Sequence, residues 1–286
     1  MKYIIFLMKS EPVLVNVIKS KCSLGEGLFI SKGIAAWVDI NSCKVFIYQN
    51  DELIFFKTKS IPSIIYDVND THITFGSNIG ISSFNINTKE EKLICSGKFI
   101  HDIEDYRSND GGSYGDNKFL SFMHLKRPDI TKGFIYRVSG NSYFLQDDSI
   151  YIPNTFIKIE DGKMLISDSL KSKIWLYDID SMGNLCNKRL WYKFESTISP
   201  DGGCMVGNLV LVALWDDASV AIFNKDGEIL SKLHLPVLRP TNCKYDLIKS
   251  QLWITSASEG LDDSELDLYP QSGNTFIYNF DKNLIC

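Results

Sequence analysis

Short runs of β-branched and aromatic residues alternate with clusters of Asn, Asp, Gly and Ser along most of this 286-residue chain. This pattern is typical of β-strands joined by tight turns. Apolar residues at the helical spacing of three and four positions are almost never sustained, so the pattern predicts an all-β fold.

Six of the apolar runs share one pattern, in which a strand ends on an aromatic residue that a polar residue follows. They cover residues 45–48, 81–84, 133–136, 174–177, 220–223 and 275–278. Their spacing is close to the roughly 40–50 residues of a four-stranded propeller blade. Because one blade cannot bury both of its faces alone, we expect a six-bladed β-propeller of four-stranded antiparallel blades.

A ring of blades needs a closing contact between the two ends of the chain. The strand-like run 13–18 precedes the first repeat, and we expect it to supply the outer strand of the last blade, which ends near Asp281. No Pro/Gly/Ser-rich linker divides the chain. We therefore expect residues 1–286 to form one domain, with a closing strand at about 11–22 and blades over 23–286. The acidic stretch 259–267 is expected to be a solvated loop.

Polar residues recur at one phase of the repeat. Glu26, Asn154 and Asp201 lie 22 or 23 positions before the blade aromatic, Asn109 and Asn242 hold similar places in blades with insertions, and the second blade has only a serine there. Such residues are common in turns, but their shared phase would bring them together where the innermost strands meet. Carboxylate and amide oxygens suit Ca²⁺, Mg²⁺ or Mn²⁺, and suit Zn²⁺ less without His or Cys.

The motifs around these residues resemble the family that contains regucalcin (senescence marker protein), gluconolactonases and luciferin-regenerating enzyme. The resemblance runs from about Ser23 to Phe280. It is carried by residues 24–27, 37–40, 107–111, 153–154, 161–163, 167–169, 199–202 and 239–243.

The resemblance implies a metal-dependent hydrolase of lactones, with sugar-acid lactones as the common substrates. It implies that Glu26, Asn154 and Asp201 bind one divalent cation, with Ca²⁺ first and Mg²⁺, Mn²⁺ or Zn²⁺ as alternatives. Arg107 and Asn109 would bind the small-molecule substrate. The cation would polarise the carbonyl and activate a water, and Asp201 would also act as the general base.

The chain departs from the family pattern beside this motif. Phe122 would fill part of the pocket, and His124 and Lys126 stand where the family has an acidic feature. Thr155 replaces a usual Gly. A basic rim of Arg107 and Lys126 would favour a substrate that carries a carboxylate or a phosphate.

Other classes of function stay open beside the lactonase. One is a propeller that keeps the metal and binds a small molecule without turnover. Another is a hydrolase of phosphoesters or organophosphates. Residues 111–115 match G-x-S-x-G, but a serine nucleophile of that kind needs a strand–turn–helix elbow that the surrounding β pattern does not provide.

Charge, cysteine content and the length of the apolar runs indicate which partners and which cellular compartment to expect. The net charge of −5 and the pI of about 5.4 argue against a nucleic-acid partner. Seven cysteines without C-x-x-C spacing indicate reduced thiols in the cytoplasm. The apolar run 3–7 is too short for a signal peptide, and no stretch approaches the roughly 20 apolar residues of a membrane span. A monomer is the default, because a propeller closes on itself.

Overall fold

The computed structural model describes residues 11–96 and 105–281. The apolar run 3–7 and Cys286 lie outside this range. Within it, the six cysteines carry free thiols, and no helix is long and apolar enough to span a membrane.

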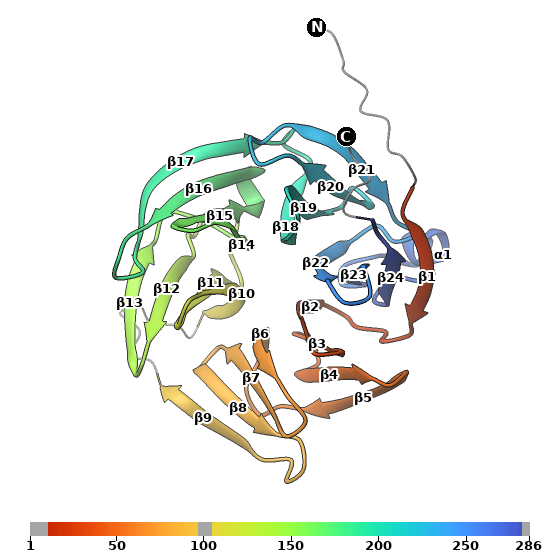
Figure 1. Ribbon diagram of the computed structural model, residues 1–286, viewed down its shortest axis with the longest axis horizontal. Coiled ribbons are helices and arrows are strands. Elements are labelled where there is room, and N and C mark those ends of the chain that lie inside the picture. The colour runs from red at the N-terminus through yellow and green to blue at the C-terminus, as the bar shows by residue number, and fades with distance from the viewer. Residues whose placement is uncertain (1–10, 97–104, 282–286) are drawn as a thin grey trace, which may run out of the picture.

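The structure is a ring of six four-stranded antiparallel sheets around a central channel (Figure 1), which confirms the six-bladed propeller. The first three blades are formed by β2 (Gly25–Ser31), β3 (Ile34–Asp39), β4 (Lys44–Gln49) and β5 (Glu52–Lys57); β6 (Pro62–Val68), β7 (His72–Ser77), β8 (Gly80–Asn85) and β9 (Glu91–Ser96); and β10 (Tyr106–Tyr114), β11 (Asn117–His124), β12 (Phe134–Ser139) and β13 (Ser142–Asp147). The next two are formed by β14 (Pro153–Glu160), β15 (Lys163–Asp168), β16 (Lys173–Ile179) and β17 (Leu185–Lys193); and β18 (Ser199–Val206), β19 (Leu209–Trp215), β20 (Ser219–Phe223) and β21 (Ile229–His234).

The sixth blade combines both ends of the described chain. It contains β22 (Pro240–Asp246), β23 (Gln251–Ser256), β24 (Thr275–Asn279) and, outermost, β1 (Val13–Ile18). β1 pairs antiparallel with β24, with Val13 opposite Asn279 and Ile18 opposite Thr275. The predicted closing strand is therefore confirmed, and it joins the ring by backbone hydrogen bonds rather than by a disulfide.

The core lies between neighbouring blades. The six repeat segments form the third strand of each blade, and their aromatic residues pack against the sheet of the preceding blade. Phe223, for example, is fully buried in a cluster that includes Ile157 and Leu165 of the preceding blade. This stacking buries both faces of each sheet, which a single blade could not do.

The innermost strands all lose regular register near one end of the channel. Shifts follow Glu26 in β2 and Asn154 in β14, and equivalent shifts occur in β6, β10, β18 and β22. A β-bulge bends a strand and re-aims its side chains. The six bulges thus turn the polar residues of the shared phase toward the channel.

Two local features bear on the sequence interpretation. Ser113 of the G-x-S-x-G match lies within β10, so it is not on a strand–turn–helix elbow. The stretch 259–267 is not wholly a loop, because the helix α1 (Asp263–Leu268) begins within it. A capping box explains the helix: Asp262 accepts from the backbone N–H of Glu265, and Glu265 accepts from that of Asp262.

Candidate functional site

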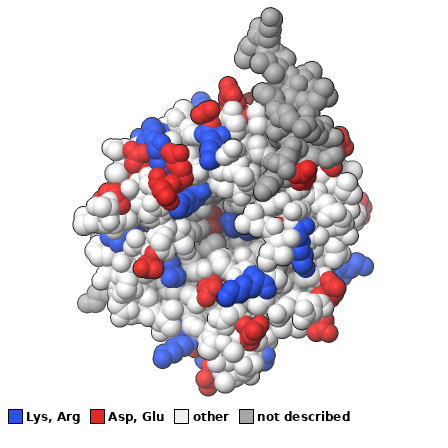
Figure 2. Space-filling model, in the orientation of Figure 1, with Lys and Arg blue, Asp and Glu red and all other residues white. Residues whose placement is uncertain are grey.

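A cavity of about 280 Å³ opens at the bulged end of the channel, where Figure 2 shows the hollow in the middle of the ring. Strands or loops from five of the six blades contribute to it, and most of the contributing segments are far apart in sequence. Its lining residues are Leu24, Glu26, Arg107, Asn109, Met123, Ile152, Asn154, Ser169, Leu170, Ser199, Asp201, Trp215 and Glu259.

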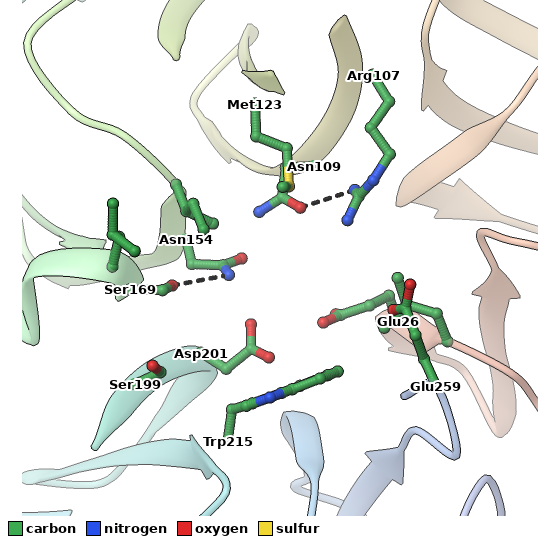
Figure 3. A pocket seen from close by; sticks show the side chains of 13 residues that line it. Glu26, Arg107, Asn109, Met123, Asn154, Ser169, Ser199, Asp201, Trp215 and Glu259 are labelled. Atoms are coloured by element: carbon green, nitrogen blue, oxygen red, sulfur yellow. Dashed lines mark hydrogen bonds between the residues drawn. The ribbon is translucent and has the colours of Figure 1, made fainter. Parts of the chain in front are cut away.

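Two carboxylates point into this cavity, Glu26 from β2 of the first blade and Asp201 from β18 of the fifth blade, with the sixth blade between the two (Figure 3). Each side chain belongs to a residue that is only 5% exposed. Glu26 Oε2 accepts from the backbone N–H of Gly27 at 3.1 Å. Asp201 Oδ1 is buried and has no hydrogen-bond partner among the described residues. A buried acceptor without a partner is costly, so this oxygen marks a place for a donor or a cation.

The raised pKa values of Glu26 and Asp201 also indicate a place for a cation. Burial, and then the nearby carboxyl of Asp110, raise the pKa of Glu26 from 4.5 to about 8. Burial, and then the charge of Glu26, raise the pKa of Asp201 well above its ordinary value. Two buried like charges disfavour ionisation of both, and a bound divalent cation would offset their repulsion.

Amide side chains complete this polar end of the cavity. Asn154 donates from Nδ2 to Ser169 Oγ at 3.1 Å, which leaves its Oδ1 for the cavity. Asn109 Oδ1 accepts from Arg107 Nη1 at 2.7 Å, and its Nδ2 donates to the Pro153 carbonyl at 3.0 Å. Figure 3 shows both amides directed toward the space between Glu26 and Asp201. The structure therefore brings Glu26, Arg107, Asn109, Asn154 and Asp201 to one cavity.

These residues fit a hard, oxygen-preferring cation. No three His, Cys, Asp or Glu side chains in residues 11–96 and 105–281 form a metal-binding group. An ion between Glu26 and Asp201 would therefore need the Asn154 carbonyl oxygen and waters as further ligands. Such mixed carboxylate, amide and water shells are usual for Ca²⁺ and Mg²⁺ and unusual for structural Zn²⁺.

Buried threonines hold the backbone of β2 and β18, the strands that carry Glu26 and Asp201, across blade boundaries. Thr155 Oγ1 donates to the carbonyl of Asp201, and Thr241 Oγ1 donates to the carbonyl of Gly25. The neighbouring blade thus fixes the backbone of Asp201 itself and that of Gly25, the residue before Glu26. Thr155 takes a positive φ of 63°, which explains why Gly is an alternative at this position.

The predicted pocket wall around β11 needs correction. Phe122 does not fill the pocket: it is fully buried between blades, in a cluster with Ile64 and Phe134. Met123 lines the cavity instead, because successive side chains of a strand point to opposite faces. Sequence spacing predicts the strand β11 but does not determine which of its two faces is turned to the channel.

The structure also does not bring Lys126 and His124 to the cavity. Lys126 Nζ lies 2.6 Å from Asp105 Oδ1, and both side chains are more than half exposed. His124 Nδ1 accepts from the backbone N–H groups of Lys126 and Arg127 at 3.2 and 3.1 Å. Of the residues that the structure describes, Arg107 is the one basic side chain that lines the cavity.

Several residues of the site carried no clear signal in the sequence. Asp110 is 2% exposed, and burial raises its pKa to about 6. Glu259 and Trp215 line the cavity. Asn242, in contrast, is predicted by the shared phase of the repeat; it is buried beside Glu26 and is not among the residues that line the cavity. The Asn109-Asp110 pair could have suggested Asp110, whereas Glu259 and Trp215 reach the cavity only through the loop and strand ends of the folded ring.

The chain was compared with known proteins. Residues 24–258 match the family model described as "SMP-30/Gluconolactonase/LRE-like region". Regucalcin from Gallus gallus is 27% identical over 202 residues, covering 66% of this chain and 67% of that protein. A protein named "Putative sugar lactone lactonase" from Rhizobium meliloti (strain 1021) is 26% identical over 176 residues, covering 59% of this chain and 60% of that protein.

Solved structures share the fold over nearly the whole length. A calcium-binding protein, regucalcin, from Agrobacterium tumefaciens superposes with a TM-score of 0.85 at 19% identity, covering 93% of this chain and 94% of that chain. Luciferin-regenerating enzyme superposes with a TM-score of 0.84 at 20% identity, covering 96% and 97% of the two chains. Together with the family match over residues 24–258, the propeller fold shows that this chain belongs to the SMP-30/gluconolactonase/LRE-like family.

Proposed function

We propose that this protein is a divalent-metal-dependent hydrolase that opens a lactone or a related cyclic ester. The observation that carries the proposal is the buried pair Glu26 and Asp201, which faces a small cavity and includes a carboxylate oxygen without a partner. The family match and the relative named as a putative sugar lactone lactonase support the same class of reaction.

Glu26, Asn154 and Asp201 would hold the cation, with Ca²⁺ as the first expectation. The calcium-binding description of the regucalcin from Agrobacterium tumefaciens supports this choice. When bound, a divalent cation supplies Lewis acidity toward a carbonyl oxygen and lowers the pKa of water.

The side chains of the chain itself supply binding and proton transfer. Asp201 would act as the general base that takes a proton from the attacking water, as its position inside a buried cavity allows. Arg107 and Asn109 would orient the ester, because the 2.7 Å bond between them and the bond from Asn109 to the Pro153 carbonyl fix both groups before the substrate arrives. The apolar walls would exclude bulk water from the reacting bond.

The test is hydrolysis of a panel of lactones by metal-stripped protein, with and without added Ca²⁺, Mg²⁺, Mn²⁺ or Zn²⁺. Asp201→Asn should lower kcat by at least about 100-fold, in the range expected for a lost general base. Asp226→Asn, a change on an exposed turn, is the matched control. Calorimetric titration with Ca²⁺ separates loss of metal binding from loss of turnover.

Each alternative function has its own outcome in this assay. Tight cation binding without hydrolysis of any lactone would favour a binding propeller. Hydrolysis of phosphoesters but not of lactones would favour a phosphoesterase. Metal-independent hydrolysis that survives Asp201→Asn would overturn the proposal.

A further inference from the structure

The cavity is lined by apolar side chains as well as by the carboxylates and amides described above. The apolar lining residues are Leu24, Met123, Ile152, Leu170 and Trp215. A volume of about 280 Å³ is at the lower end for small-molecule sites, so a ligand that reaches the carboxylates must also contact this apolar lining.

Trp215 forms a fixed wall of this apolar lining. The guanidinium of Arg239 lies over the indole, 5.0 Å from the ring centroid. Arg239 is itself fixed, because its Nε donates to Asp216 at 2.6 Å and its Nη1 donates to the carbonyl of Glu259. Figure 3 shows the indole extending past Asp201 toward Glu26. A flat apolar surface therefore lies directly beside the reacting end.

Met123 forms the opposite wall. It is the cross-strand partner of Arg107 in the β10–β11 register, so the two side chains are neighbours on the same face of the blade. A thioether is only a weak hydrogen-bond acceptor and donates nothing. At this wall a substrate hydroxyl would lose water without gaining a comparable partner.

Two of the polar side chains that line the cavity are engaged with the protein itself. Ser169 Oγ donates to the Pro200 carbonyl at 2.7 Å and accepts from Asn154. Both ends of the Asn109 amide are bonded. Substrate hydroxyls could use Ser169 and Asn109 only by competing with these bonds.

The charges of the cavity balance without a charged substrate. Three carboxylates and one guanidinium line it, from Glu26, Asp201, Glu259 and Arg107. A bound divalent cation would compensate the two negative charges in excess. With Lys126 paired to Asp105 outside the cavity, Arg107 is the one basic side chain that lines the cavity among residues 11–96 and 105–281, which gives little reason to expect a carboxylate or phosphate substrate.

We infer that the substrate is a neutral lactone with an alkyl or other apolar substituent, and that Met123 and Trp215 determine this preference over polyhydroxylated lactones. The inference deepens the proposed function and rests on it for turnover. The apolar substituent packs between Met123 and Trp215, while the ester group faces Glu26 and Asp201.

The test compares δ-lactones of equal ring size with Ca²⁺ present. The alkyl lactones form a series with side chains of increasing length. Glucono-δ-lactone is the hydroxylated lactone with which they are compared. We expect kcat/KM to be at least about tenfold higher for a short alkyl lactone, and to rise roughly fourfold per methylene until the chain fills the cavity. A higher kcat/KM for glucono-δ-lactone would overturn the inference.

Met123→Gln adds a donor and an acceptor at nearly constant side-chain volume. It should reduce the alkyl preference by about tenfold. Met182→Gln, at a residue 69% exposed, is the matched control and should leave the preference unchanged. An alkyl preference that Met123→Gln and Trp215→Gln both leave intact would overturn the assignment of these residues.

Calorimetric binding of non-hydrolysable δ-lactams separates this inference from the proposed function. If no lactone is hydrolysed but an alkyl lactam binds more tightly than a hydroxylated lactam, the proposed function fails and the inferred pocket chemistry stands. If the hydroxylated lactam binds more tightly, or both bind equally, the inferred pocket chemistry fails whatever the turnover.

Discussion

Replacing Glu26 with Gln tests the buried acidic pair through protein stability. In metal-free protein, Glu26 would ionise near pH 4.5 in the unfolded chain but near pH 8 in the folded protein. The folded state therefore binds more protons between these values, and the free energy of unfolding falls as the pH rises through this window. Below pH 4.5 this destabilisation is absent, and above pH 8 it is complete.

The size of the effect follows from the pKa. A rise from 4.5 to about 8 corresponds to about 5 kcal/mol of lost stability for Glu26 once the pH exceeds 8. Glu26→Gln removes the ionisable group, so the variant should be more stable than the wild type at pH 9 and little different at pH 4. Ca²⁺ at 100 times its Kd should stabilise the wild type by about 2.7 kcal/mol, and the variant by much less.

Equilibrium urea unfolding of metal-stripped protein at pH 4, 7 and 9 measures the effect. The wild type, Glu26→Gln and Glu52→Gln are compared, the last being a control at an exposed residue of β5. Equal pH dependence of stability in the wild type and in Glu26→Gln would refute the reasoning, because Glu26 would then ionise as an ordinary carboxyl does.

Three further changes test how the ring holds the site. Thr241→Val removes the hydroxyl that donates to the Gly25 carbonyl, and it should lower the free energy of unfolding by about 1–3 kcal/mol in urea titrations, because a buried acceptor loses its partner. Gly202→Ala should weaken Ca²⁺ binding by at least tenfold in calorimetry without unfolding the protein, because the new Cβ would overlap the Asn242 side chain beside Glu26. Deleting residues 1–18 removes β1 and exposes the edge of β24, so size-exclusion chromatography should show association or aggregation; an unchanged elution profile would contradict the role of β1 in closure.

The sequence predicted the parts of the structure that repeat. The aromatic third strands, the closing strand and the shared phase of Glu26, Asn154 and Asp201 all depend on spacing along the chain. Spacing fixes which residue of each blade stands near the channel, and the bulges then bring those residues together.

The remainder of the site depends on contacts that spacing does not encode. Whether Phe122 or Met123 faces the channel is decided by the pleat of β11, and a shift by one residue exchanges the two faces. Trp215 reaches the cavity at the end of its strand, and Glu259 does so from the segment before α1. Lys126 is turned away by its contact with Asp105. None of these outcomes follows from residue type alone.

The central claim is that Glu26, Asn154 and Asp201 bind one divalent cation. The most direct measurement is anomalous diffraction from crystals soaked in Ca²⁺. The account predicts one anomalous peak that depends on Ca²⁺ and is not at a sulfur atom, with oxygens of these three side chains at about 2.3–2.6 Å from it. A calcium-dependent peak only elsewhere in the molecule, or well-ordered side chains at the cavity with no such peak between them, would contradict it.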